Sequence, residues 1–595
     1  MNTENNRQKL GLSLSGGGFR AALFHIGVLN NMAERDLLRK VEILSTVSGG
    51  SIIGAMYYLK VKEFYEGGRP DLKISKEAFV QIVKEIEEDF TSAIKKNLRM
   101  RTFLNVFKNM KMFRADYSRS DRISELYSEY LYQPLWKRMR KNNSKLPKEI
   151  FLKDLKIIPT KDLWPIGHAE FNFDTYQESA EFKIPVIVIN ATTLNTGHCW
   201  QFTSSWVGEK IDFSYNTFLN QNSLLTAIRF DEADLLPPKQ KKKLLNLQLG
   251  DAVASSACVP GIFSPFAIHD LYATSDHRSS YIVQLVDGGV YDNQGLYSLL
   301  EENCTQIICS DASLQLCDDL SPSTGILGVT QKANDILMDR VRDYQINQVF
   351  PINGKSETSK VFIQIKDKKI STALPEKITN GFINAVSSLR TDLDSFTEKE
   401  STSAIFAGYK IADEQLKNFD QNNPSAKRNW SDFENELLKD KEVLFQLEKG
   451  SQSAFKIFRI NFLLAFIVLL FLCTTITSII IWLFSHLKDQ ITILERLPLP
   501  LGFTIGGIVL ISSVILFVRG LCNLFKIRSM NSFLNYGIGQ LFIYTSLFPF
   551  LFLICVSLLV GLHIYVFDKL FLWSGRLKVP ENDLRDINLE EVILD

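Results

Sequence analysis

The serine at position 48 stands where a buried strand gives way to a helix. Val41–Val47 is rich in β-branched and apolar residues, and Ile52–Leu59 has the composition of a helix. A serine on such a tight turn keeps its Oγ exposed beside the N–H groups that begin the helix. Gly49 and Gly50 leave the space that the turn requires. We therefore predict that Ser48 is a nucleophile.

The sequence around this serine departs from the common nucleophile motif at one position. In G-x-S-x-G a glycine stands two residues before the serine, and here that residue is Thr46. The match alone is weak evidence, because Ser-Gly-Gly-Ser also occurs in ordinary loops. A Cβ at position 46 narrows the turn, so we expect a small residue to pack against it.

A second glycine cluster lies near the start of the chain. Lys9–Ser15 alternates like a strand, and the helix-like Ala21–Leu29 follows Gly16-Gly17-Gly18-Phe19-Arg20. Two nucleotide-binding motifs fail here, since no P-loop lysine follows and Ala21 replaces the third glycine of G-x-G-x-x-G. The remaining interpretation is an oxyanion hole, in which backbone N–H groups stabilise a tetrahedral intermediate. Ser48 ends the next strand, and parallel neighbouring strands would bring both loops together.

A carboxylate ends a later strand in the same way. Tyr281–Val286 reads as a strand, and Asp287-Gly288-Gly289 follows it directly. Strand ends are where α/β enzymes place their chemistry. Two other nearby carboxylates, Asp292 and Asp311, we interpret as structural.

Taken in order, these motifs resemble those of the patatin-like phospholipases. The family pattern is G-G-G-x-R, then G-x-S-x-G, then D-G-[GA], and the resemblance covers about residues 9–420. Asn190–Gly197 and Ala252–Pro265 also look like core segments of bacterial members. The resemblance implies an α/β fold, a three-layer α/β/α sandwich, and hydrolysis by a Ser–Asp dyad without histidine. It implies no metal and no organic cofactor.

Carried over residue by residue, the resemblance makes Ser48 the nucleophile and Asp287 its base. Arg20 would hold the glycine loop or favour anionic character nearby. A carboxylate activates serine only when it is desolvated and within about 2.6–3.2 Å, so the dyad needs a dry site. The expected oxyanion donors are the N–H groups of Gly16, Gly17, Gly18, Phe19 and Gly49, with Gly50, Gly288 and Gly289 in support.

A histidine-dependent triad is left open as an alternative. The chain has seven histidines: His25, His168, His198, His269, His277, His486 and His563. The order Ser–Asp–His with Asp287 would need one of the last two, which lie in or beside the apolar C-terminal region. A triad of Asp251 with His269 or His277 remains compatible with the order. His25 we expect to pack behind the glycine loop.

The composition of the first three-quarters of the chain, with charged residues throughout, is typical of a soluble protein. A chain of 595 residues is too long for one core, and a net charge of +1 gives no reason to expect a nucleic-acid partner. Its eight cysteines show no C-x-x-C spacing, which predicts reduced, buried thiols. The polar N-terminus shows no signal peptide, so we expect a cytoplasmic catalytic domain.

Two kinds of segment suggest contact with a lipid bilayer. Lys95–Arg114 carries seven basic residues and no acidic one, with Phe103, Phe107 and Met110 at helical spacing. It predicts either an amphipathic helix on an anionic membrane or a packed helix with a solvated basic face. Three uncharged stretches are long enough, or nearly so, to span about 30 Å of hydrocarbon: Phe462–Phe484, Leu501–Val518 and Leu541–Phe567.

These segments divide the chain into four parts. We expect an acyl hydrolase domain at 1–420, a charged helical connector at 421–460, an all-α segment of three transmembrane helices within 461–567, and a tail at 568–595. The basic residues before the first span and between the second and third favour a cytoplasmic N-terminal domain and an exterior C-terminus. The expected location is the bacterial inner membrane.

The sequence therefore predicts a membrane-anchored serine acyl hydrolase that cleaves phospholipids or lysophospholipids through an acyl-enzyme. The partners implied are the substrate lipid and the bilayer, with a homo-oligomer through the transmembrane helices left open. One alternative is a regulated membrane effector whose C-terminal helices assemble in or perturb the bilayer. Another is an acyltransferase or a neutral-lipid esterase, which the same motifs would serve.

Overall fold

The structure is a computed structural model of the chain. It describes residues 7–464 except 70, 74, 115, 165–169, 211–224, 274–279, 314–320, 323, 351–358, 369, 371–373, 420–427, 440 and 451–455. It also describes residues 466–468, 470, 474 and 478, and residues 553–577 except 555.

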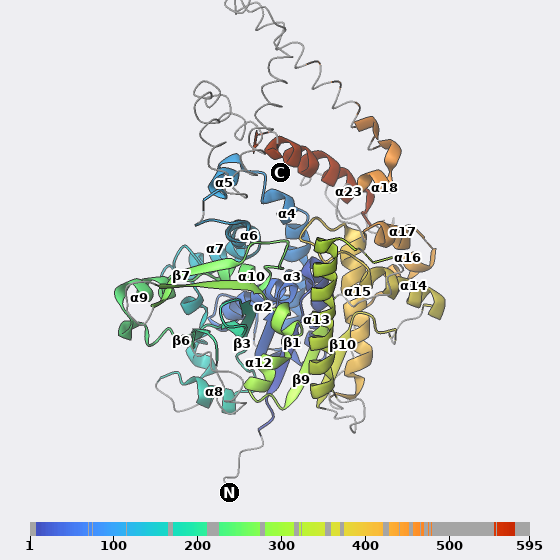
Figure 1. Cartoon of the computed structure of the whole chain (residues 1–595). Helices are drawn as coiled ribbons and strands as arrows, with labels where there is room; N and C mark the ends of the chain where they lie inside the picture. The colour runs from blue at the N-terminus through green and yellow to red at the C-terminus, as the bar shows by residue number, and fades with distance from the viewer. Residues whose placement is uncertain are drawn as a thin grey trace, which may run out of the picture. The chain divides into compact units, whose positions relative to one another are not determined.

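The strands form one ten-stranded sheet (Figure 1). They are β1 Leu10–Leu14, β2 Val41–Val47, β3 Val186–Thr193, β4 Cys199–Phe202, β5 Trp206–Gly208, β6 Ile228–Arg229, β7 Phe266–Ala273, β8 Ser280–Asp287, β9 Gln306–Asp311 and β10 Lys360–Gln364. The order is β10-β9-β1-β2-β3-β4-β5-β6, and the first five strands in this order are parallel. β8 pairs antiparallel with β7 and with the end of β3.

The helices around this sheet begin with three long ones, α1 Gly18–Glu34, α2 Gly49–Tyr65 and α3 Lys76–Ile94. The shorter helices that follow are α4 Leu98–Arg101, α5 Val106–Lys111, α6 Arg119–Tyr127, α7 Gln133–Asn142, α8 Phe173–Ser179, α9 Pro238–Leu245, α10 Leu249–Ser256, α11 Gly289–Asp292 and α12 Leu296–Glu301. The later helices are α13 Ile326–Val349, α14 Glu376–Ser387, α15 Glu398–Gln415, α16 Ser431–Lys439, α17 Lys441–Gly450, α18 Ile457–Ile460 and α23 Asp568–Ser574.

Alternate residues of the parallel strands feed two separate apolar layers. Leu44 and Ile308 belong to the larger core, which includes residues of α1, α2, α3 and α15. Their strand neighbours Ile43 and Ile307 belong to the smaller core, together with residues of α12 and the end of α13. Successive strand side chains point to opposite faces, so both faces of the sheet are covered by helices. The predicted α/β/α sandwich is confirmed, as is the parallel pairing of β1 with β2.

α15 packs against α1 closely enough for backbone to touch backbone. A Cβ added to Gly27 would lie 2.0 Å from the Ile405 carbonyl oxygen. A Cβ added to Gly408 would lie 2.1 Å from the Phe24 carbonyl oxygen. Only glycine fits at these two positions, and α15 is thereby fixed as part of the α/β fold.

By contacts between residues the chain divides into two compact units. One consists of residues 1–102, 115–456 and 571–595 and the other of residues 103–114 and 457–570. Residues 421–456 of the expected connector belong to the first unit, in which α16 and α17 bury Phe433, Leu437 and Leu447 in the larger core.

The basic stretch Lys95–Arg114 is not one continuous helix. Asn97 adopts a left-handed backbone conformation and caps α4, and the Asn105 side chain caps α5 by accepting the N–H of Lys108 at 3.1 Å. Asparagine bonds its local backbone readily, which ends one helix and starts the next. Phe107 and Phe113 of this stretch are exposed.

The predicted transmembrane segments are only partly within the described residues. Leu501–Val518 lies outside them, and so do the end of Phe462–Phe484 and the start of Leu541–Phe567. Among the described residues one helix, Val556–Ser574, is long and apolar enough to cross a membrane, with 19 residues and a mean hydropathy of 1.5. By length and composition alone this weakly supports a membrane association.

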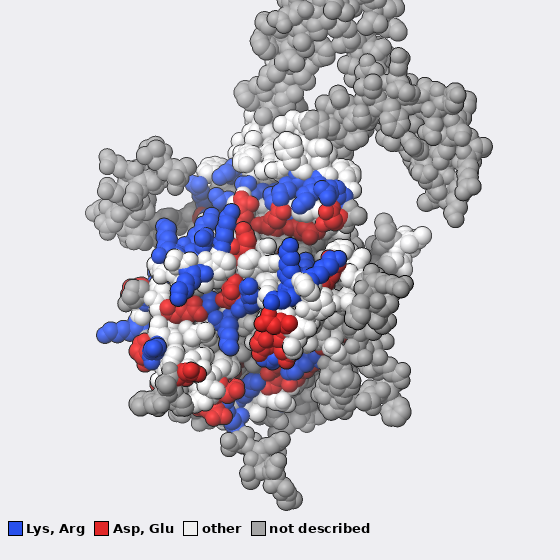
Figure 2. Space-filling model, turned by 90° about the vertical axis from the view of Figure 1, so that its left-hand side faces the viewer, with Lys and Arg blue, Asp and Glu red and all other residues white. Residues whose placement is uncertain are grey.

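The described surface carries both signs of charge. In Figure 2 basic and acidic side chains are interspersed over the face shown, in keeping with the net charge of +1. Four buried cysteines in the described chain, Cys199, Cys258, Cys304 and Cys309, are free thiols. No group of three or more His, Cys, Asp or Glu side chains among the described residues could hold a metal ion.

Candidate active site

Ser48 occupies the sharp turn between β2 and α2. Its backbone angles are φ 49° and ψ −114°, outside the regions that residues with a Cβ normally adopt. Such strain persists only where the surrounding structure holds it, and it is concentrated at functional sites. The turn directs the chain from the end of the strand straight into the first helical turn.

Asp287 lies at the end of β8 and faces this serine. The Ser48 hydroxyl lies near enough to its carboxylate to lower the pKa, and its Oδ1 accepts the N–H of Gly289 at 2.7 Å. Burial raises the pKa of the Asp287 carboxyl to about 6, although the Gly289 N–H and the Ser48 hydroxyl both favour the charged form. The predicted pair is thus brought together in a site from which water is largely excluded.

The sheet explains how two residues 239 positions apart in the sequence meet. β3 lies between their strands, with Val47 of β2 opposite Asn190 and Asp287 of β8 opposite Ala191. A Cβ added to Gly288 would lie 2.4 Å from the Asn190 carbonyl oxygen. The glycine after the carboxylate therefore lets the β8 turn close onto β3.

The glycine loop narrows the set of oxyanion donors. Gly16 donates its N–H to the Asn293 carbonyl at 3.0 Å, and Phe19 donates to the Asp392 carbonyl at 3.3 Å. These two predicted donors are already used within the protein. In the described chain, the N–H groups of Gly17, Gly18 and Gly49 have no protein acceptor.

Gly18 and Gly49 approach each other beside the candidate nucleophile Ser48. A Cβ added to Gly49 would lie 2.2 Å from the Gly18 carbonyl oxygen and 2.8 Å from the Gly18 nitrogen. Gly17 and Gly18 have φ of 134° and 58°, which glycine adopts without strain. The first turns of α1 and α2 thus place unpaired N–H groups together near Ser48, an arrangement suited to a developing oxyanion.

Arg20 holds this loop from behind. Its guanidinium is fully buried and donates to the carbonyls of Ser387 at 2.6 Å, Leu389 at 3.0 Å and Ala312 at 2.9 Å. Burial lowers the pKa of Arg20 to about 10, opposed by the charge of Asp311, so the group stays cationic at neutral pH. Of its two expected roles, the contacts favour the structural one.

Ser256, at the end of α10, was not singled out from the sequence. Its Oγ accepts the N–H of Ser48 at 2.9 Å and lies 2.8 Å from the Ser51 Oγ. Its carbonyl accepts the N–H of Gly288 at 3.2 Å. One residue therefore supports both the nucleophile turn and the carboxylate turn. Its only signal in the sequence is its place in a run of small residues.

Thr46 fits the turn because two features accommodate it. Its hydroxyl donates to the Val188 carbonyl at 3.2 Å and accepts from Ser51 at 3.1 Å. The expected small neighbour is Gly54, where an added Cβ would lie 2.5 Å from the threonine Cγ2. The threonine that replaces the motif's glycine is thus accommodated by a glycine, Gly54, in the early part of α2.

Comparison with known proteins identifies the family of the first half of the chain. The patatin-like phospholipase family profile matches residues 12–300. This part of the chain is a patatin-like phospholipase domain. No curated protein matches the chain. Among solved structures, VipD from Legionella pneumophila matches with 12% identity and a TM-score of 0.27, over 97% of this chain and 93% of that one. A score this low says nothing about function.

The described histidines of the patatin-like domain bond away from the dyad. His25 lies behind the glycine loop, as predicted, between the Ser310 Oγ at 2.7 Å and the Ser15 carbonyl at 2.9 Å, and burial lowers its pKa to about 4. His198 pairs with Glu209 at 2.8 Å. His269 is exposed on β7, and His277 lies outside the described residues.

The other carboxylates near the dyad have structural partners. Asp251, the acid of the alternative triad, accepts the Ser124 hydroxyl at 2.7 Å. Asp292 accepts three backbone N–H groups, and burial raises its pKa to about 6. Asp311 is paired with Arg342 at 2.8 Å, which lowers its pKa despite burial. These contacts agree with the structural roles expected for Asp292 and Asp311.

An apolar turn follows Ser256 and is connected to Asp287 by a backbone hydrogen bond. The Asp287 N–H donates to the Cys258 carbonyl at 2.9 Å, and the next residues are Val259-Pro-Gly-Ile262. The Ile262 N–H donates to the Val259 carbonyl at 3.2 Å and Gly261 has φ 82°, which is a type II turn. Val259 and Ile262 are 39% and 54% exposed, so the turn after Cys258 presents apolar side chains at the surface.

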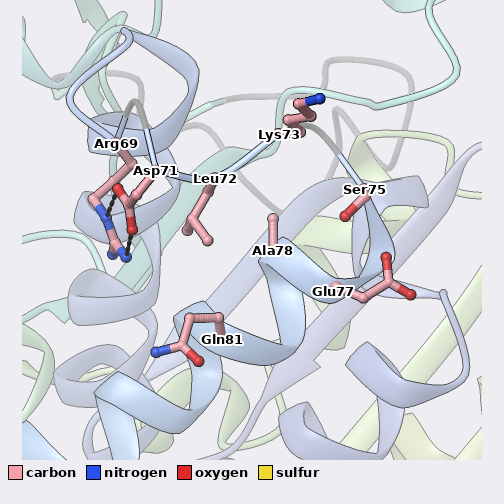
Figure 3. Close-up of a pocket in the computed structure, with 8 residues that line it drawn as sticks. All are labelled: Arg69, Asp71, Leu72, Lys73, Ser75, Glu77, Ala78 and Gln81. Carbon is pink, nitrogen blue, oxygen red and sulfur yellow. Dashed lines mark hydrogen bonds and ion pairs between the residues drawn. The ribbon is translucent and has the colours of Figure 1, made fainter.

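A hollow elsewhere on the patatin-like domain has a different character. It has a volume of about 430 Å³ and is lined by Arg69, Asp71, Leu72, Lys73, Ser75, Glu77, Ala78 and Gln81 (Figure 3). Arg69 is held by Asp71 at 2.8 Å and by Glu85 at 2.9 Å. Its guanidinium is committed to carboxylates, and the lining contains no residue of the dyad.

Proposed function

We propose that the protein is a serine lipid acyl hydrolase that works through a dyad of Ser48 and Asp287. The family domain supports lipid acyl hydrolysis in general. The observation that carries the finer proposal is the buried Asp287 carboxylate at the end of β8, close enough to the Ser48 hydroxyl for that hydroxyl to lower its pKa. This arrangement combines a nucleophile on a strained turn with a base whose pKa is close to neutral.

The reaction follows from these positions. The Ser48 Oγ attacks the ester carbonyl carbon as Asp287 takes its proton, and the carbonyl oxygen becomes an oxyanion. The N–H groups of Gly17, Gly18 and Gly49 stabilise this charge. The intermediate collapses to an acyl-enzyme, and the proton on Asp287 passes to the departing alcohol. Asp287 then deprotonates a water, which attacks the acyl-enzyme, and the proton passes from Asp287 to the Ser48 Oγ as the fatty acid leaves.

A carboxylate serves as the base here because of its surroundings. An ordinary aspartate, with a pKa near 4, is a weak proton acceptor at neutral pH. Burial raises the Asp287 pKa to about 6, which keeps the group ionised at pH 7.5 while strengthening it as a base. Asp287 cannot stabilise the negative charge that forms on the carbonyl oxygen of the substrate. The free N–H groups beside Ser48 supply that stabilisation.

The substrate we propose is a phospholipid or lysophospholipid in a bilayer to which the protein is anchored. The apolar turn at Val259–Ile262 supports a lipid substrate because it offers exposed hydrocarbon next to Cys258, whose carbonyl accepts the Asp287 N–H. The apolar helix Val556–Ser574 and the uncharged stretches before it support anchoring. Anchoring would raise the local concentration of lipid around the site. The basic residues near the spans favour a cytoplasmic catalytic domain.

The test is release of fatty acid from mixed phospholipid vesicles by the full chain, with Ser48→Ala and Asp287→Asn beside it. We expect release by the wild type and a loss of at least about 100-fold in each variant with the fold retained. Asp292→Asn is the matched control, since that buried aspartate bonds only backbone N–H groups. Release unaffected by Asp287→Asn would contradict the dyad. Absence of release from folded wild type would favour a membrane effector.

A further inference from the structure

The bridging segment, Ser387–Thr397, runs from the last residue of α14 to the residue before α15 and lies directly behind the oxyanion loop. Arg20 donates to its Ser387 and Leu389 carbonyls at 2.6 and 3.0 Å. Phe19 donates its N–H to the Asp392 carbonyl at 3.3 Å. These bonds fix the start of α1 against the bridging segment.

The contact at Gly18 is closer still. A Cβ added to Gly18 would lie 2.1 Å from the Thr391 carbonyl oxygen and 3.2 Å from that of Asp392. Gly18 is one of the expected oxyanion donors. Because its backbone packs against the Thr391 and Asp392 carbonyls, their position sets the direction of the Gly18 N–H. A movement of the bridging segment would therefore turn the donor, and small displacements of such groups are costly for catalysis.

The far side of the bridging segment is held by four buried charges. Arg390 donates to Asp394 and to Glu400, both at 2.5 Å, and Lys456 donates to Asp394 at 2.7 Å. The four side chains are 0–3% exposed, and their charges cancel. Buried charges of this kind are stable only when fully paired, so the cluster has one well-defined arrangement.

The chain before and after residues 457–570 docks on this cluster. Arg390 donates to the Gly450 carbonyl at 2.6 Å, and Lys456 donates to the Ser395 carbonyl at 3.0 Å. From the chain that follows residue 570, the centre of the Phe571 ring lies 4.2 Å from the Lys456 Nζ. The Gly575 carbonyl accepts the N–H of Lys399 at 3.0 Å.

We propose that the bridging segment is a positioning element of the oxyanion hole and that Lys456 is a positioning residue acting through it. The proposal rests on the proposed hydrolase function. Lys456 touches neither the dyad nor the glycine loop, but it pins Asp394 and Ser395, two to four residues after the carbonyls that seat Gly18 and Phe19. The residues that border 457–570 in the sequence thereby set the geometry in which the oxyanion is stabilised.

The experiment compares Lys456→Met with Lys410→Met in the full chain. Lys410 lies on α15 and, like Lys456, forms an ion pair, in its case with Glu434 at 2.9 Å. Its ion-pair partner lies outside the bridging segment. We measure kcat and KM for a soluble short-chain ester and the affinity of an alkyl boronic acid, which forms a tetrahedral adduct on serine. Hydrogen exchange is followed in peptides that cover residues 14–24.

Lys456→Met is expected to lower kcat about 10-fold with KM unchanged, a fraction of the loss from deleting a whole oxyanion donor. Boronate affinity should fall by a similar factor, and exchange at Gly17–Phe19 should quicken. Lys410→Met should show none of these changes. Equal kcat, boronate affinity and exchange in the two variants would overturn the proposal.

A second variant covers the case in which Lys456→Met does not fold. Gly575→Ala removes no charge but places a Cβ 2.4 Å from the Thr397 Cβ, so it displaces the end of the bridging segment. It should give the same pattern, and an unchanged pattern would count against the proposal. If the wild type has no esterase activity, the proposed function fails while hydrogen exchange at the glycine loop still decides the coupling.

Discussion

The Ser48 N–H and the Ser256 Oγ form a hydrogen bond of 2.9 Å. The same Ser256 receives the Gly288 N–H on its carbonyl at 3.2 Å. Since Gly288 follows the proposed base directly, the end of α10 holds both the nucleophile turn and the carboxylate turn. The distance between Ser48 and Asp287 thus depends on a residue that takes no part in the proposed proton transfer.

Ser256→Ala should therefore lower kcat more than it changes KM. Removing Oγ leaves the Ser48 N–H without its acceptor and frees the strained turn, and we expect a loss of about 10- to 100-fold in kcat. Ser255→Ala is the matched control, because its hydroxyl bonds within α10 to the Asp251 carbonyl at 2.7 Å. Steady-state kinetics on a soluble ester provide the measurement. Equal effects of the two substitutions would count against a role for Ser256 in positioning.

The pH dependence of hydrolysis should report the proposed base. Burial raises the Asp287 pKa to about 6, and only the ionised carboxylate can accept the serine proton. We expect kcat/KM to be level above about pH 7 and to fall about tenfold per unit well below pH 6. Near-ultraviolet circular dichroism at each pH shows that the fold is retained. A profile that stays level down to pH 5 in folded protein would exclude Asp287 as the base.

The same burial should cost stability at neutral pH. Between pH 4 and 6 the unfolded Asp287 has lost its proton while the folded one keeps it, so stability falls as pH rises through this window. Asp287→Asn removes the dependence and should raise the free energy of unfolding at pH 7.5 by up to about 3 kcal/mol. The gain should shrink towards zero at pH 4. Denaturant titrations at both pH values test this, and a gain independent of pH would contradict the assignment.

Thr46 and Gly54 should be energetically coupled. Gly54→Ala places a Cβ 2.5 Å from the Thr46 Cγ2 and should lower the free energy of unfolding by about 1–3 kcal/mol. In a Thr46→Gly background the Cγ2 is absent, and most of the cost should disappear. Equilibrium unfolding of both single variants and the double variant closes the cycle. Additive effects would show that the two residues do not compete for the same space.

The apolar turn should matter for lipid in a bilayer and not for soluble esters. Ile262→Ser removes an exposed apolar side chain, and burying such a group contributes about 1.5–3 kcal/mol. We expect the apparent KM for vesicles to rise about 10-fold, with hydrolysis of a soluble ester within about twofold of wild type. Ile158→Ser is the control, because Ile158 is equally exposed, at 51%, near the opposite end of α2. Equal loss on both substrates would show that Ile262 supports the fold instead.

The sequence predicted the parts of the fold that depend on local pattern. The strand–glycine–helix units around Gly16 and Ser48 are local, and parallel pairing of β1 with β2 places them side by side. The sequence also predicted that a small residue packs against Thr46. That this residue is Gly54 depends on the pitch of α2. The placement of Asp287 across β3 required the antiparallel return of β8, which no local pattern indicates.

Contacts between distant segments were beyond the sequence. Ser256 is one small residue in a run of small residues, and only its position in space marks it. The N–H groups of Gly16 and Phe19 had the right place in the motif, but carbonyls of Asn293 and Asp392 accept them. The residues 421–460 were expected to be a connector because they are rich in charge, yet their apolar positions complete the core through α16 and α17.

The contact between Lys456 and the Phe571 ring constrains the order in which the bridging segment gains its contacts during synthesis. Chains are synthesised from the N-terminus and fold as their segments emerge. Phe571 and Gly575 leave the ribosome only after residues 457–570, so the bridging segment is fastened on both sides only after the apolar region has been made. A nascent chain would thus carry Ser48 and Asp287 with a loose oxyanion loop. The contacts of Phe571 and Gly575 with Lys456 and Lys399 would therefore be the last to support the bridging segment during synthesis.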